Sequence, residues 1–257
     1  MPELAFYLAA ALLIGMPCAM TLGRRTALRI DKRADEEGDA GVGALDAAVY
    51  GLFGLLLAFI FSGAASRFDH RREMIVTEAN AIGTAYLRVD LLPAETQASL
   101  RPLFRSYVES RLATYRNIDQ GLEAAMAEYR HSLELQTQIW RQALAGAQRT
   151  ANPAVYTLVL SALNEMIDIT TTRLAASRFH PPTIIYAMIF ALGLATAFLA
   201  GTSMAKSRRR HWPHVVAFSL VISATVFVII DIEFPRLGFI RVDSADLLLV
   251  ELLESMQ

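Results

Sequence analysis

The sequence has very little cysteine and no recognisable catalytic motif. Its single cysteine, Cys18, excludes disulfides within one chain and makes thiol chemistry unexpected. There is no His-Glu-x-x-His motif, no Gly-x-Ser-x-Gly motif, no phosphate-binding glycine loop and no cluster of cysteine and histidine. We therefore expect no catalytic residues, no metal, no cofactor and no enzyme activity. The formal net charge of −1 gives no reason to expect nucleic acid as a partner.

Charge is also absent from four long stretches. The chain is 54% hydrophobic, its mean hydropathy is +0.36, and none of its 24 Lys and Arg residues falls in these stretches. A helix needs about 20 consecutive apolar residues to cross a bilayer core. The first stretch lacks a basic start and an A-x-A-like cleavage site, so we expect it to be retained. Four transmembrane helices are therefore predicted, over Leu4–Leu22, Ala47–Ser66, Thr183–Ala205 and Trp212–Ile230.

The long segment between the second and third stretches reads as helical and water-soluble. It has no strand-like alternation, and no helix-breaking residue separates Ser66 from Arg67, so the second helix is predicted to continue beyond the membrane. Pro93 predicts a new helix start, and Asn152 followed by a proline predicts another, with Asn152 as N-cap. The apolar stripes expected to face the bundle core are Leu122, Met126, Tyr129 and Leu133, then Val155, Val159, Ala162, Met166 and Ile169.

The predicted fold is thus an all-α membrane protein with four transmembrane helices and a helical soluble domain inserted between the second and third. The expected divisions are residues 1–66 (helices 1 and 2 with a basic loop at about 23–46), 67–181 (soluble domain), 182–232 (helices 3 and 4) and 233–257 (C-terminal tail).

Two short loops carry clusters of basic residues. They would lie on one side of the membrane, and short loops rich in Lys and Arg tend to stay in the cytoplasm. The soluble domain is then expected on the outer side, with the inverted arrangement as the alternative. The basic residues are Arg24, Arg25, Arg29, Lys32 and Arg33 in the first loop, and Lys206, Arg208, Arg209 and Arg210 in the second.

The second transmembrane helix has one face of small residues and a bulky opposite flank. The small face lets helices approach closely in lipid, or it lines a pore. The bulky flank faces lipid or a neighbouring helix, or it forms a hydrophobic constriction. The small face is Ala47, Gly51, Gly54, Ala58, Ser62 and Ala65, and the bulky flank is Phe53, Leu57 and Phe61.

Charged residues follow the second and fourth helices. Arg67, Arg71 and Glu78 share a helical stripe, with Asn80 nearby, which predicts either an Arg/Glu ladder or a cationic vestibule for anions. After the fourth helix, Asp231 lies at the membrane edge, where a carboxylate costs far less than at the centre. We expect an interfacial ion pair of Asp231 with Arg236, or with Arg241.

Two segments of the chain resemble the bacterial bestrophin-like domain family. The first is residues 55–93, above all the run from Glu78 to Arg88, and the second is residues 231–241. Residues 65–72 are more remotely similar to bestrophins, which are pentameric anion channels with four membrane helices. The aromatic pair that follows the arginine in bestrophins is here Phe68 and Asp69. Bestrophins also hold the helical domain in the cytoplasm, whereas the basic loops here indicate the opposite.

The resemblance implies a multi-pass protein of the bacterial inner (plasma) membrane that assembles with itself, as a pentamer in bestrophins. The first functional hypothesis is a homo-oligomeric channel for small inorganic anions. The alternative is a non-conducting membrane protein whose helical domain binds a partner or senses the cell envelope. Under both hypotheses the expected partners are the lipid bilayer and other copies of the chain.

The distribution of basic residues gives the first testable prediction. Alkaline phosphatase or a fluorescent protein fused near Gln148 reports which side of the membrane the inserted domain occupies. We expect an active phosphatase fusion and a dark fluorescent fusion, because the two basic loops hold their side in the cytoplasm. The reverse pattern would contradict the predicted orientation and would agree with the bestrophin arrangement.

Overall fold

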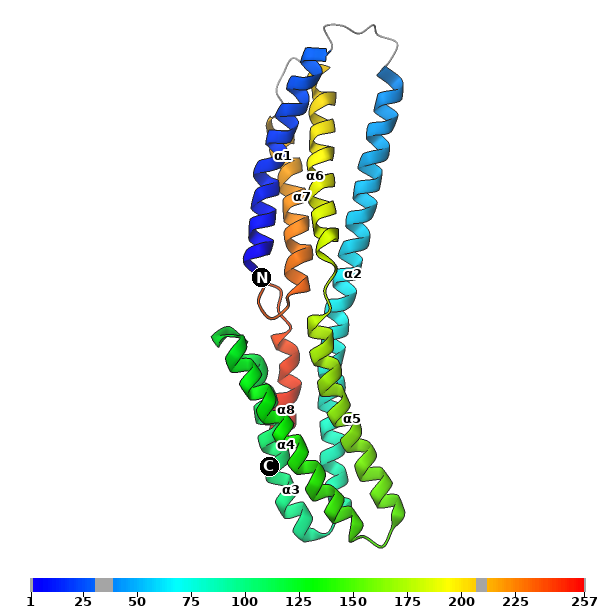
Figure 1. The fold of residues 1–257 in the computed structure, drawn as a ribbon, viewed down its shortest axis with the longest axis vertical. Coiled ribbons are helices and arrows are strands. Elements are labelled where there is room, and N and C mark those ends of the chain that lie inside the picture. The colour runs from blue at the N-terminus through cyan, green and yellow to red at the C-terminus, as the bar shows by residue number, and fades with distance from the viewer. Residues whose placement is uncertain (1, 31–38, 207–211, 257) are drawn as a thin grey trace. The chain divides into compact units, whose positions relative to one another are not determined.

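The computed structural model describes residues 2–30, 39–206 and 212–256, and every regular element within these ranges is helical. The chain divides into two units. Unit 1 comprises Met1–Arg67 and His180–Phe234, and unit 2 comprises Phe68–Phe179 and Pro235–Gln257. The structure therefore groups the segment after the fourth long helix with the inserted segment. Figure 1 labels the elements along the chain.

Among the described residues, four helices are long and apolar enough to cross a membrane, and their apolar parts lie in unit 1. The third and fourth predicted spans fit the observed helices closely, whereas the first and second observed helices extend well beyond their predicted spans. The second runs unbroken for 50 residues, which confirms the predicted continuation through Arg67. The basic positions at 32–33 and 208–210 lie outside the described residues. The helices are α1 (Pro2–Ile30), α2 (Asp39–Arg88), α6 (Thr183–Ser203), which is followed by η5 (Met204–Lys206), and α7 (Trp212–Glu233).

Helix α1 packs directly on α6 and α7. At Gly201 an added Cβ would collide with the backbone carbonyl of Met20, and at Gly23 it would collide with that of Phe198. These two glycines therefore let the α1 and α6 backbones approach more closely than any side chain would permit. The apolar core of unit 1 forms around them, with Leu12, Met16, Phe53, Leu57, Ile189 and Ile229 among its buried members.

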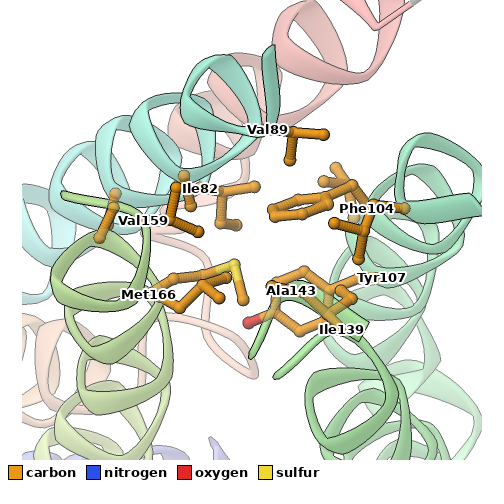
Figure 2. Close-up of a cluster of buried hydrophobic side chains, with 14 of the residues drawn as sticks. Ile82, Val89, Phe104, Tyr107, Ile139, Ala143, Val159 and Met166 are labelled. Carbon is orange, nitrogen blue, oxygen red and sulfur yellow. The ribbon is translucent and has the colours of Figure 1, made fainter. Parts of the chain in front are cut away.

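Unit 2 is a helical bundle with its own apolar core. Figure 2 shows buried side chains of this core as sticks. The labelled residues are Ile82, Val89, Phe104, Tyr107, Ile139, Ala143, Val159 and Met166. The elements that join the second half of α2 are η3 (Val89–Leu91), α3 (Ala94–Arg116), η4 (Asn117–Gln120), α4 (Leu122–Gln148), α5 (Pro153–Arg178), η6 (Asp243–Asp246) and α8 (Leu247–Ser255).

The local signals for α5 are confirmed, while the predicted face of α4 is right at Tyr129, which is buried, and wrong at Leu122 and Leu133. The Asn152 side chain accepts a hydrogen bond from the backbone N–H of Ala154 at 3.0 Å, as an N-cap should. On α4, Leu122 is 75% exposed and Leu133 is also exposed. The buried face runs through Tyr129, Ser132 and Gln136, so a search for large apolar side chains alone misses its polar members. The predicted α5 residues Val159, Ala162 and Met166 are all buried.

Candidate functional site

The small-residue face of α2 is exposed within the chain. Gly51, Gly54, Ala58 and Ser62 are all exposed, and a Cβ built on either glycine meets nothing within 4 Å. The described residues of this chain therefore do not close the face. Both alternatives drawn from the sequence, packing against another copy and lining a pore, need this accessibility.

The bulky flank of α2 holds that helix to its own protomer. Phe53 and Leu57 are buried in the apolar core of unit 1, whereas Phe61 is exposed. The sequence left three surroundings open for this flank: lipid, a neighbouring helix or a pore constriction. Phe53 and Leu57 face neighbouring helices. The expectation that all three form one constriction is thereby corrected, because two of them are already covered by apolar side chains.

A buried carboxylate, Glu233, joins three segments of unit 1. Its side chain is 1% exposed and accepts hydrogen bonds from Arg67, with Nε at 3.0 Å from each oxygen and Nη2 at 2.9 Å from Oε2. His180 Nδ1 lies 3.3 Å from Oε1, and the His180 ring stacks on Phe234 with centroids 4.6 Å apart. A bidentate guanidinium is the partner that a desolvated carboxylate needs.

We call Glu233 and its two partners, Arg67 and His180, the clasp. These residues lie at the points where the chain passes between unit 1 and unit 2. Unit 1 ends at Arg67, resumes at His180, and ends again at Phe234, next to Glu233. One carboxylate thus ties together all three chain crossings. No partner for Glu233 was predicted from the sequence, and Arg67 lies 166 residues away along the chain.

A second buried carboxylate, Glu78, organises unit 2. Its Oε1 accepts a hydrogen bond from Arg111 Nε at 2.6 Å, and its Oε2 pairs with Arg173. The Arg/Glu ladder, which was expected within or between helices, thus forms between helices at Glu78, with one arginine from α3 and one from α5. Arg71 donates instead to the backbone carbonyls of Ala176 and Phe179, at 3.2 and 3.0 Å, where a cation stabilises the C-terminal end of α5. Of the four vestibule candidates, Asn80 is exposed, Arg67 and Arg71 are half-buried, and Glu78 is buried.

Three guanidiniums surround the ring of Tyr115. Those of Arg111, Arg173 and Arg236 lie 5.2, 4.2 and 4.7 Å from its centroid. Such cation–π contacts spread positive charge over an aromatic face. Burial raises the pKa of the Tyr115 phenol, so the ring stays neutral while its oxygen accepts a hydrogen bond from Arg111 at 2.6 Å.

Arg236 is held by aspartates of its own unit. Its Nη2 donates to Asp246 at 2.8 Å, and its Nη1 lies 3.2 Å from Asp243. Burial acts to lower the pKa of Arg236, but the hydrogen bond and charge of Asp246 outweigh it, so that this pKa is raised. Arg236 is therefore paired with Asp243 and Asp246, and the pair expected for Asp231 with Arg236, or with Arg241, stays a prediction.

Comparisons with known proteins agree on one family. The family model described as "Bestrophin-like domain" matches residues 11–247. Two crystal structures of a bacterial bestrophin homologue from Klebsiella pneumoniae are similar in fold. A tyrosine-to-alanine variant gives a TM-score of 0.63 at 15% identity, covering 95% of this chain and 98% of that one. An aspartate-to-alanine variant gives 0.65 at 13% identity, covering 95% and 97%. The comparison with curated proteins found no match.

The Glu78 cluster gives a prediction about stability. Glu78→Gln should lower the free energy of unfolding by about 3–5 kcal/mol, because it leaves two buried guanidiniums without their carboxylate. The matched control is Asp90→Asn, which breaks the exposed pair with Arg101 and should cost less than about 1 kcal/mol. Thermal unfolding of the detergent-purified protein measures both. Equal losses in the two variants would mean that Glu78 does not organise unit 2.

Proposed function

The chain belongs to the bestrophin-like domain family, and from this premise we propose that it forms a homo-oligomeric ion channel in the bacterial inner membrane. In this proposal α2 of each subunit faces a central axis through its small-residue face. A pentamer is the assembly that the family resemblance implies.

The observation that carries this proposal is the exposed small-residue face on a helix that is anchored from its other side. Phe53 and Leu57 fix α2 to its own protomer, while Gly51, Gly54 and Ala58 face away from it. In lipid, small faces are used where another helix approaches closely. Around a central axis, the same small side chains leave room for a lumen.

Selectivity for anions is proposed from the arginines that follow the membrane part of α2. Arg67 is 34% exposed, whereas its partner Glu233 is 1% exposed, so that the positive end of the pair reaches solvent. Arg71 lies one helical turn further along α2. Repeated around a ring of subunits, these charges form a positive collar, and charged rings bias which ions enter a pore.

Added bulk on the small face tests the channel proposal. Gly54→Leu should leave the oligomer intact but reduce chloride flux into liposomes, since the new side chain fills the lumen. Ala48→Leu is the matched control, because Ala48 is exposed on α2 outside the small face. Size-exclusion chromatography with light scattering measures the assembly.

Two other outcomes would change the assignment. Loss of the oligomer in Gly54→Leu alone would mean that the face packs against another copy and is not open. Absence of any ion flux in the unmodified oligomer would favour the alternative, a non-conducting membrane protein whose helical domain binds a partner or senses the envelope.

Reversing the clasp tests charge selectivity without removing the ion pair. The combined change Arg67→Glu and Glu233→Arg keeps one charge of each sign but exposes the negative end. We expect permeability to shift towards cations at 0.1 M salt, where the Debye length is about 10 Å, and much less at 1 M, where it is about 3 Å. Arg67→Glu alone should fold poorly, because it places two carboxylates together. Unchanged selectivity in a well-assembled double variant would exclude Arg67 from the collar.

A further inference from the structure

The segment between α7 and η6 forms a closed loop. The backbone N–H of Val242 donates to the carbonyl of Pro235 at 3.2 Å, so that the two ends of the loop meet. Both of these residues are buried. The loop therefore has a fixed base, and its intervening residues form a tip.

The base of this loop is anchored to the charged cluster of unit 2. Arg236, the second residue of the loop, binds Asp246 and Asp243, and its guanidinium lies 4.7 Å from the Tyr115 ring centroid. A partly buried arginine with two carboxylate partners and an aromatic face beneath it has little freedom to move. The contacts of Arg236 therefore hold the base of the loop, and with it the tip, in a fixed position.

The tip itself is apolar and exposed. It reads Leu237, Gly238, Phe239 and Ile240, with no charged residue among the four. Phe239 is 86% exposed and Leu237 is 41% exposed. Exposure of large apolar side chains on a surface marks an interaction site.

The position of the loop in the chain identifies its partner. It begins two residues after α7 ends at Glu233, and α7 is one of the helices apolar enough to cross a membrane. An extended chain spans at most about 3.6 Å per residue, so Phe239 lies within roughly 20 Å of the end of α7. The interfacial layers of a bilayer begin where a transmembrane helix ends, and aromatic side chains are enriched there.

We propose that Leu237 and Phe239 insert into the interfacial layer of the lipid bilayer beside the end of α7. The loop then anchors the C-terminal segment of unit 2 at the membrane surface, with the apolar tip in lipid and the Arg236 base outside it. This inference depends on α7 crossing the membrane. It does not depend on whether the protein conducts ions.

Tryptophan fluorescence of the full-length protein in liposomes tests the proposal. The background carries Trp140→Phe and Trp212→Phe, so that a single new tryptophan reports its own surroundings. Phe239→Trp is compared with Leu122→Trp, a control at an exposed apolar position at the start of α4. Quenching is measured with lipids brominated either near the headgroup or near the ends of the acyl chains.

We expect Phe239→Trp to emit at shorter wavelength than Leu122→Trp and to be quenched more strongly by the bromines near the headgroup. Long-wavelength emission without quenching would place the tip in water and overturn the proposal. Short-wavelength emission without quenching would also overturn it, because the tip would then be covered by protein. If Phe239→Trp does not assemble, Leu237→Trp in the same background is read by the same criteria.

Discussion

A carboxylate that stands at the end of an apolar helix must be neutralised where it is, and Glu233 imposes this requirement on unit 1. Its side chain is buried, so the bidentate guanidinium of Arg67 is needed to offset the loss of water. That requirement fixes the rotation of α2 about its own axis, because Arg67 has to point towards α7. His180 joins the same carboxylate from the segment before α6. The three chain crossings are therefore held by one charge and its partners.

The rotation of α2 also decides which of its faces remains accessible. Phe53, Leu57 and Arg67 lie on one side of the helix, where they contact the apolar core and Glu233. Gly51 and Gly54 are consequently turned away, and a Cβ at either would meet nothing. The small face is exposed because the opposite face of α2 makes two kinds of contact, the apolar packing of Phe53 and Leu57 and the ion pair of Arg67 with Glu233. A change at Arg67 therefore acts on the presentation of the small face as well as on local charge.

The features that were predictable from sequence are those that depend on neighbouring residues. Long apolar stretches gave the four helices, and an asparagine before a proline gave the cap at Asn152. The ion pairs were not predictable, since Glu78 and Arg111 are 33 residues apart and Arg67 and Glu233 are 166 apart. An Arg/Glu ladder was expected near Glu78, but the arginines that form it, Arg111 and Arg173, come from distant helices and could not be named from the sequence. Sequence spacing alone carries no information about such distant partners.

The C-terminal segment completes the core of unit 2, and this constrains the order of folding. Leu249 of α8 is fully buried in the apolar core of unit 2, and Asp246 balances Arg236 beside Tyr115. Without residues 235–257, the bundle of residues 68–179 would lack both this apolar packing and the Asp246 carboxylate. Those residues follow α6 and α7 in the chain, so unit 2 cannot finish folding until the last two apolar helices have been synthesised.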